Sequence, residues 1–193
     1  MFENNWLGDK TGQGFYKKGK DADGNTVIES LNLTTLEYSA QDKPRFDSIG
    51  KARGANRLSS KLGILYSGGD PAADFYHDII TAIAAYSANR IPEIADDLYQ
   101  IDDALRAGFG WEVGPFETWD LIGFDKVLAN IEKAGYVVPQ WILDFKAKGN
   151  TTFYKSEYGK RKYYNILKAE YEVIPGTEAF IVLDNFRTPE PLY

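Results

Sequence analysis

The spacing of apolar residues predicts α-helices through the centre of the chain. Across residues 72–84, apolar side chains recur every three or four positions, which places them on one face of a helix. Asp70 and Pro71, directly before this stretch, are typical of an N-cap followed by the first helical residue. Pro92 is expected to kink or restart the helix, and the apolar stripe resumes over residues 94–105.

Proline and glycine divide the next part of the chain into three shorter helices. The predicted helices cover residues 115–122, 124–134 and 139–148, and Gly149 stops the last of them. Pro115 and Pro139 suit first helical turns, because those positions need no backbone donor. Glycines follow the ends of the predicted helices, where a left-handed residue commonly closes the last turn.

Short aromatic and β-branched runs on either side of this helical centre predict strands. Two hairpins and one further strand are expected, with strand residues 15–17 and 26–28, 152–155 and 162–164, and finally 180–183. An Asp-Gly turn signal between the first two runs supports the first hairpin.

Together these elements predict a mainly α fold, a helical bundle with small β-hairpin appendages. The order along the chain is a glycine-rich fragment at 1–18, a hairpin and linker at 19–57, a helical core at 58–149 and a β appendage at 150–193. The polar stretch at 39–57 is expected to act as a linker that contains one short helix.

Composition removes most of the usual catalytic groups. The 193 residues include 22 basic and 28 acidic side chains, and the net charge of −6 argues against a surface for nucleic-acid phosphates. Cysteine is absent and histidine occurs once, which excludes a disulfide framework, a cysteine nucleophile and a multi-histidine metal site. No apolar run approaches the roughly 20 residues that span a bilayer. We expect a cytoplasmic protein without a secretory signal, a location that suits a chain without cysteine.

His77 is the single histidine, and it lies within the first long helix. A catalytic role would require a partner acid, for which Asp74 and Asp78 are the candidates. A hydrogen-bonded pair on the helix surface is the favoured interpretation, because Asp74 lies three residues earlier on the same face.

Five acidic residues cluster where the second half of the apolar stripe begins. Paired carboxylates can bind a metal ion or serve as a general acid and base. A solvated helix face is the favoured interpretation, with one of the acids capping the nearby corner. The five residues are Glu93, Asp96, Asp97, Asp102 and Asp103.

Three other motifs have both a chemical and a structural interpretation. Residues 8–14 contain glycines around Lys-Thr, but their order is not that of a phosphate-binding loop, so a structural corner is favoured. Residues 21–25 lack the glycine and glutamate positions of a calcium loop and suit a hairpin turn. Residues 160–162 are basic and lie among tyrosines; protection of a strand edge is favoured over contact with an anion.

Large aromatic residues and glycines gather between residues 108 and 123. Such a stretch builds either a tightly packed corner or the wall of an apolar ligand slot. The physical pattern favours the packed corner.

This stretch also carries a resemblance. Residues 108–123, GFGWEVGPFETWDLIG, resemble the signature of the C-terminal helical domain of 3-hydroxyacyl-CoA dehydrogenases, and residues 101–105 match the approach to it. Residues 6–16, WLGDKTGQGFY, resemble the loop that closes the first helical repeat of that family. The similarity is closest to bacterial fused β-oxidation proteins, in which a Rossmann NAD domain precedes two helical repeats and a crotonase-like enoyl-CoA hydratase domain follows. Residues 181–186 resemble the segment that enters this last domain.

The resemblance implies that residues 1–18 end a first helical repeat, that 58–149 form the second, and that 150–193 form a hairpin and connector to a missing downstream domain. It implies NAD as the cofactor of the parent enzyme and none in this chain. No catalytic, cofactor-binding or metal-binding residue is transferred, because the family's NAD loop and catalytic His–Glu pair have no counterpart here. His77 matches neither their context nor their position. Asn89 lies near the place of the family's substrate-contacting asparagine, but in the repeat that resembles the non-catalytic copy.

The expected function is therefore that of a non-catalytic helical portion of an NAD-dependent 3-hydroxyacyl-CoA dehydrogenase of fatty-acid β-oxidation. It would serve domain assembly and acyl-CoA cleft formation, with the parent's Rossmann domain, first repeat and downstream crotonase-like domain as partners. Binding of acyl-CoA by the chain alone is expected to be weak or undetectable. The alternative is a free-standing helical module that binds a partner protein or acyl-CoA without turnover.

The resemblance also leads to an expectation about packing. Eight large apolar residues are predicted to be mostly buried, while an apolar patch remains where the first repeat belongs. The eight residues are Ile79, Ile83, Ile94, Leu98, Leu105, Trp111, Phe116 and Trp119.

Overall fold

The computed structural model describes residues 1–41 and 44–179. Within this part of the chain there are seven α-helices and two antiparallel three-stranded sheets. The chain divides into two compact units, Met1–Arg45 and Phe46–Tyr193. The mainly α class with small β appendages is confirmed.

The first unit contains a short 3-10 turn and a sheet with strand order β1-β2-β3. The turn is Asp9–Thr11, and the strands are β1 (Tyr16–Lys20), β2 (Thr26–Leu31) and β3 (Tyr38–Ala40). The first predicted hairpin is confirmed as β1 and β2, which pair from Tyr16 opposite Ser30 to Lys20 opposite Thr26.

Strand β3 was not predicted, because it is only three residues long and depends on contacts made far along the chain. The Tyr38 hydroxyl donates to the carbonyl oxygen of Gly14 at 2.5 Å. The rings of Trp6 and Tyr38 meet edge to face with centroids 5.8 Å apart, and the Lys17 ammonium lies 4.4 Å from the Tyr38 ring centre. One tyrosine thus joins the glycine loop to the sheet.

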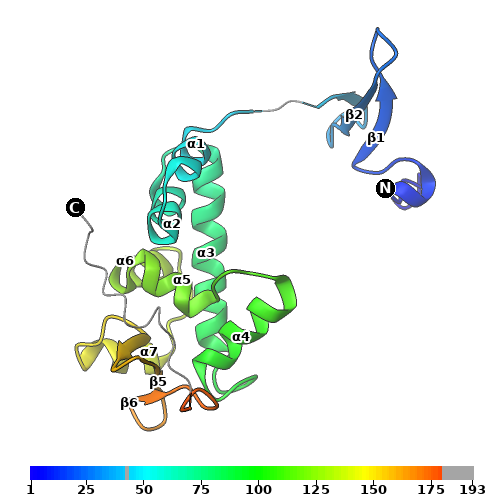
Figure 1. Ribbon diagram of the computed structural model, residues 1–193. Helices are drawn as coiled ribbons and strands as arrows, with labels where there is room; N and C mark the ends of the chain where they lie inside the picture. The colour runs from blue at the N-terminus through cyan, green and yellow to red at the C-terminus, as the bar shows by residue number, and fades with distance from the viewer. Residues whose placement is uncertain (42–43, 180–193) are drawn as a thin grey trace. The chain divides into compact units, whose positions relative to one another are not determined.

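The second unit holds all seven α-helices. They are α1 (Asp47–Gly54), α2 (Leu58–Ser67), α3 (Pro71–Asn89), α4 (Leu98–Phe109), α5 (Pro115–Ile122), α6 (Phe124–Lys133) and α7 (Gln140–Ala147). Figure 1 shows α1 and α2 beside one end of the long helix α3, and α4 beside its other end. The Asp70 side chain accepts a hydrogen bond from the Ala73 N–H at 3.0 Å, so the predicted N-cap of α3 is confirmed.

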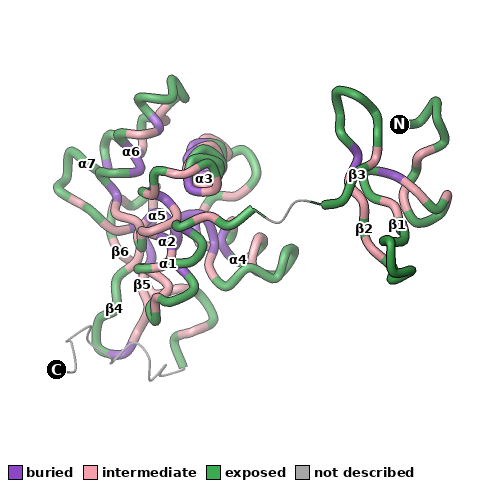
Figure 2. Tube along the Cα trace, turned by 90° about the horizontal axis from the view of Figure 1, so that it is seen from above, coloured by how far each residue is buried: buried purple, intermediate pink, exposed green. Residues whose placement is uncertain are grey.

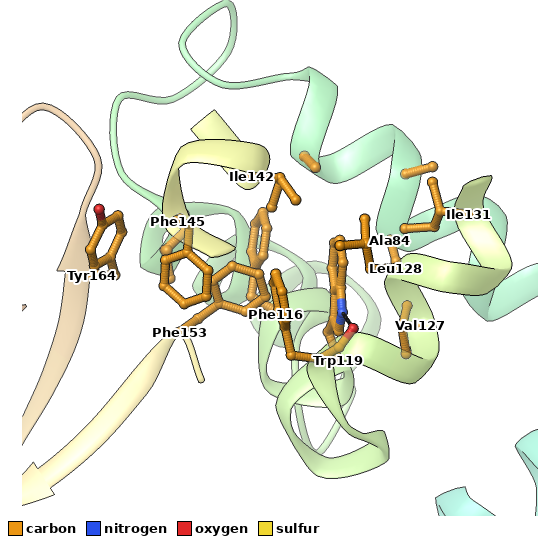
Figure 3. Packing of buried hydrophobic residues seen from close by; sticks show 14 of the residues in the cluster. Ala84, Phe116, Trp119, Val127, Leu128, Ile131, Ile142, Phe145, Phe153 and Tyr164 are labelled. Atoms are coloured by element: carbon orange, nitrogen blue, oxygen red, sulfur yellow. Dashed lines mark hydrogen bonds between the residues drawn. The ribbon is translucent and has the colours of Figure 1, made fainter. Parts of the chain in front are cut away.

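The aromatic core lies where α5, α6, α7 and the start of the second sheet meet. Phe116 and Trp119 extend from α5 toward Phe153, and both ring pairs have centroids 5.2 Å apart (Figure 3). Phe145 of α7 lies 4.9 Å from Phe153, and Phe124 of α6 lies 5.6 Å from it. Phe153 is fully buried and connects the helices to the sheet.

The second sheet has strand order β4-β5-β6, with β4 (Tyr154–Glu157), β5 (Lys160–Asn165) and β6 (Glu170–Val173). The second predicted hairpin is confirmed as β4 and β5. Strand β6 was not predicted. It places the basic residues 160–162 on a central strand, so the interpretation that they protect a strand edge is wrong. The strand predicted at 180–183 lies outside the described residues.

The prediction of buried residues is confirmed at three positions and wrong at three. Leu98, Phe116 and Trp119 have at most 1% of their surface exposed, and Ile83 and Leu105 are half-buried. The three wrong positions are exposed: Ile79, Ile94 and Trp111. Figure 2 shows purple segments mainly between the helices and green segments along the outer loops. The three exposed residues belong to an outward face, which explains the error.

Across the described residues, no helix has both the length and the apolar character that crossing a membrane requires.

Candidate functional site

Asp102 lies at the centre of a polar cluster where α4, α5 and β4 meet, and it has no exposed surface. Its Oδ1 accepts the Phe116 N–H at 2.9 Å, while Oδ2 accepts the Glu117 N–H at 3.1 Å and the Tyr154 hydroxyl at 2.7 Å. The two N–H groups belong to the first turn of α5, where the helix offers them no partner of its own. Asp102 therefore caps α5 from the neighbouring helix.

Gly114 allows this close approach. A Cβ added to Gly114 would lie 2.4 Å from the Cα of Asp102, which is closer than any real contact. The φ of Gly114 is −82°, a value open to any residue, so the requirement for glycine comes from the contact and not from the backbone angle. This explains one glycine of the 108–123 stretch.

Glu117 is buried beside Asp102 and is held by two arginines. Its Oε1 accepts from Arg106 Nη1 at 2.8 Å and from Arg161 Nη2 at 2.5 Å, and its Oε2 accepts the Gly114 N–H at 2.7 Å. Burying a single carboxylate is costly, and two guanidinium groups offset that cost. Arg161 of β5 is thus an ion-pair partner of the buried Glu117.

Asp120 fastens α5 to the start of β4. Its two carboxylate oxygens accept the N–H groups of Phe153 at 2.8 Å and Tyr154 at 2.9 Å. Burial raises the pKa of Asp102 and of Asp120, each to about 7, and it raises the pKa of the Tyr154 hydroxyl well above its usual value.

The polar cluster stabilises the fold and offers little to a substrate. A cavity of about 420 Å³ opens beside it, lined in part by Arg106, Glu117, Asp120 and Arg161. The carboxylate oxygens of Asp102, Glu117 and Asp120 all accept internal hydrogen bonds. A general acid or base must reach the reacting atom, and Asp102 reaches no solvent. Within the described residues, no three acidic or histidine side chains are grouped as a metal ion would require.

Sequence reasoning missed most of this cluster. Glu117 carried a local signal, because an acid three residues into a helix often bonds back to the residue before it. Tyr154 and Arg161 carried none, because their partners lie more than 40 residues away along the chain.

The second candidate site is an apolar groove between α3 and α4, with a cavity volume of about 580 Å³. Large apolar side chains from both helices and the following corner line it. They include Ile83, Tyr86, Ile94, Leu105, Phe109 and Trp111. The aromatic corner is therefore divided, since Phe116 and Trp119 fill the core while Phe109 and Trp111 face the groove.

Helix α3 buries small residues and exposes several of its large apolar residues. Its buried residues are Ala73, Thr81, Ala84, Ala85, Ser87 and Ala88. On the outer face, Phe75 has 66% of its surface exposed, Tyr86 62% and Ile79 39%. Such an arrangement is the reverse of an ordinary surface helix and marks a face that is suited to contact with another molecule or domain. We call the outer residues of α3 together with the α3–α4 groove the apolar face.

The structure does not place His77 in a catalytic arrangement with either candidate acid, Asp74 or Asp78. Its Nδ1 lies 3.1 Å from Asp78 Oδ1, and its ring lies 4.7 Å from the ring of Tyr66. Asp78 is exposed to solvent. The surface interpretation therefore fits, with Asp78 as the partner in place of Asp74.

Asn89 is occupied by the backbone. Its Nδ2 donates to the carbonyl oxygens of Ala85 at 2.8 Å and Val137 at 2.7 Å. Both donor hydrogens of the amide group are used to hold the end of α3 against the segment before α7.

The predicted acidic cluster does not act as one group. Glu93 binds Arg90 at 2.7 Å, Asp103 binds Arg106, and Asp97 precedes α4 as its N-cap. The interpretation as a solvated face is wrong for Asp102, which is buried, whereas the expectation that one acid caps the corner is confirmed.

In the first unit, the glycine loop and the Asp-Gly turn each make hydrogen bonds within their own segment. The Thr11 hydroxyl lies within 3.3 Å of the carbonyl oxygen of Gly8 and 3.1 Å of that of Gln13. Asp21 Oδ1 accepts the N–H groups of Asp23 at 3.0 Å and Asn25 at 2.8 Å, and these bonds lower the pKa of Asp21. Both segments fit the structural interpretation.

Comparison with known proteins finds one matching family and several similar proteins. Residues 79–166 match the family described as "3-hydroxyacyl-CoA dehydrogenase, C-terminal domain". The chain is 39% identical over 174 residues to a protein of Bacillus subtilis (strain 168) named "Probable 3-hydroxyacyl-CoA dehydrogenase", a match that covers 90% of this chain and 21% of the relative. It is 25% identical over 193 residues to the "Putative fatty acid oxidation complex trifunctional enzyme" of Rickettsia felis, covering 97% of this chain and 24% of that protein.

The chain thus spans less than a quarter of the length of these curated relatives. No solved structure matches it.

Proposed function

Residues 79–166 of this chain belong to the C-terminal domain family of 3-hydroxyacyl-CoA dehydrogenases, and from this premise we propose that the chain is the non-catalytic helical portion of a longer NAD-dependent enzyme. In the proposed reaction, the parent oxidises the 3-hydroxyl group of a 3-hydroxyacyl-CoA to a ketone. A hydride passes to NAD and a proton is released. The role of this chain is to assemble the domains and to form one wall of the acyl-CoA cleft.

The apolar face of α3 and α4 is the observation that carries this proposal. A helix that buries alanines and exposes Phe75, Ile79 and Tyr86 would lower its free energy by being covered. The curated relatives are about four times as long as this chain, so a covering domain within the same polypeptide is available to them.

The residues present do not fit an NAD site. In a dinucleotide-binding fold, the glycine-rich loop follows a strand and opens a helix, so that backbone N–H groups meet the pyrophosphate. Residues 8–14 instead enclose the short 3-10 turn and precede β1, and the Thr11 hydroxyl is already bonded within the loop. We assign NAD binding and the redox step to another part of the parent.

The proposal extends to the division of the chain and to its partners. Residues 1–18 end the first helical repeat, 19–57 form a hairpin and linker, 58–149 form the second repeat, and 150–193 lead to a downstream crotonase-like domain. The partners are the Rossmann domain and the first repeat of the parent, acyl-CoA binds weakly to the isolated chain, and the location is the cytoplasm. No catalytic residue is assigned to this chain, because the family's NAD loop and catalytic His–Glu pair have no counterpart in its sequence. The Asn89 amide, which is occupied by backbone carbonyls, is consistent with this proposal.

The test combines activity with binding. The purified chain should produce no NADH, measured by absorbance, from a 3-hydroxyacyl-CoA and NAD. It should bind the polypeptide that is encoded in frame directly upstream of Met1, measured by calorimetry. Turnover by the chain alone would overturn the proposal. A native stop after Tyr193 and a native start at Met1, with tight binding of acyl-CoA, would favour the free-standing module instead.

A further inference from the structure

Arg90 stands at the end of α3, at the polar rim of the apolar face. Its Nη1 bonds Glu93 Oε2 at 2.7 Å, and its guanidinium carbon lies 5.2 Å from the ring centre of Tyr86. Its Nε is buried and has no hydrogen-bond partner, and it is the single such side-chain atom that the described part of the chain contains. A buried donor without an acceptor is unfavourable, because it has lost water and gained nothing.

From this atom and its surroundings we propose that Arg90 is the polar anchor of the apolar face, and that it selects a partner helix that brings a hydrogen-bond acceptor. The inference rests on the proposed function, in which the first helical repeat of the parent is a partner, and it takes the occupant of the apolar face to be an amphipathic helix of that repeat. It adds which residue fixes the register of that helix and what chemistry the helix must carry.

The extent of the apolar face indicates a helix and not a compact ligand. On the same side of α3, the exposed Ile79 lies one turn from Ile83 of the groove and one turn from Phe75. Phe75 helps to line a second apolar cavity of about 430 Å³, together with Ile49 and Leu65. Helix α3 has 19 residues, so this face follows a helix of about 28 Å. An opposing helix covers such a length with apolar residues at every third and fourth position.

The chemistry of Arg90 specifies what the partner places at the end of the groove. The groove lining is almost entirely apolar, so it gives affinity but little register. Nε itself is buried while the Arg90 side chain as a whole keeps 31% of its surface exposed, so the side chain must turn for Nε to meet an incoming carbonyl or carboxylate oxygen. A partner that brings the acceptor satisfies a donor that the free chain leaves unpaired, whereas a partner without one leaves that donor unpaired.

The test compares affinity with stability in variants of the full 193-residue chain. The probe is the polypeptide encoded in frame upstream of Met1, titrated by calorimetry. Arg90→Met removes the donors and keeps the apolar stem, and Arg90→Lys keeps the charge but loses Nε. Glu93→Gln is the matched control, because it breaks the exposed ion pair and leaves Arg90 intact. We expect both Arg90 variants to bind at least about tenfold more weakly, with unchanged melting temperatures, and Glu93→Gln to bind like the wild type.

Each other result is decisive. Equal affinity of the wild type and Arg90→Met overturns the anchor and leaves the proposed function standing. Equal weakening by Glu93→Gln also overturns it, because the ion pair and not Nε would then matter. A wild-type chain that does not bind the upstream polypeptide overturns the proposed function and the anchor together.

Discussion

Two buried carboxylates and one half-buried carboxylate show how acidic residues can be structural in this protein. Asp102, Glu117 and Asp120 each accept backbone N–H groups at the start of α5, at Gly114 or at the start of β4. Only Glu117 also has arginine partners. For the two aspartates, the effect of desolvation on the pKa therefore outweighs that of the hydrogen bonds they accept. This difference leads to predictions at the scale of single residues.

Gly114→Ala tests the close approach of α4 to α5. The added methyl group would lie 2.4 Å from backbone and side-chain atoms of Asp102, so the helices must separate or the cap must break. We expect a loss of about 3 kcal/mol in the free energy of unfolding, measured by urea denaturation. Gly108→Ala is the control, because nothing lies within 4 Å of its Cβ position in α4 and alanine favours helix by up to about 1 kcal/mol. Equal effects at the two positions would contradict the interpretation.

The two aspartates also predict how stability depends on pH. Burial raises the pKa of Asp102 and Asp120 from 3.8 to about 7, so the native state holds these protons more tightly than the unfolded chain. The free energy of unfolding should therefore fall as pH rises from about 4 to 7 and then level off, by at most about 1.4 kcal/mol per pH unit for each group. Carboxylates with a lowered pKa, such as Asp70, titrate below this interval.

Urea denaturation at pH 5, 6, 7 and 8 measures this slope. Asp120→Asn cannot ionise, so its decline should be shallower than that of the wild type. A wild-type stability that is constant or rises over this interval would show that the aspartates keep a normal pKa.

At the scale of elements, the sequence predicted where the helices lie better than which way they face. The apolar period of α3 and the cap at Asp70 identify the helix correctly. The same period cannot show that the core side carries alanines while Ile79 faces outward, because both faces of α3 are rich in apolar residues. Strands β3 and β6 were missed since both are short and add to a sheet through partners earlier in the chain. The capping by Asp102 was expected only in general terms, because its partners depend on tertiary packing.

Phe153 connects the second sheet to the helices, and its removal tests that connection. Five aromatic rings lie within 6 Å of its ring centre, and it has no exposed surface. We expect Phe153→Ala to lower the free energy of unfolding by about 4 kcal/mol in chemical denaturation. Phe109→Ala, which removes a ring that is 71% exposed, should change it by no more than about 0.5 kcal/mol. A small effect at Phe153 would mean that the sheet is not part of the core.

At the scale of the whole molecule, the helical unit has a well-packed core but leaves one apolar face of its surface uncovered. The core cluster extends from Tyr66 of α2 to Tyr164 of β5. The buried residues that α3 contributes to it are alanines, and the partly buried Ile80 packs against it. Replacing side chains of the apolar face should therefore leave the folding of this unit intact and change its association with other molecules. This separation distinguishes a surface that is built for contact from a core that is merely incomplete.

The last prediction uses that separation. The double variant Ile94→Glu and Phe109→Gln replaces two residues of the groove that are 67% and 71% exposed. Apolar surface of this extent favours association in water, so we expect the wild-type chain alone to form concentration-dependent oligomers in sedimentation experiments, and the double variant to remain closer to a monomer. The melting temperature should be nearly the same for both, because neither side chain belongs to the core cluster. If the variant instead unfolds at a markedly lower temperature, the groove contributes to the fold of this chain, and the argument that it awaits a partner fails.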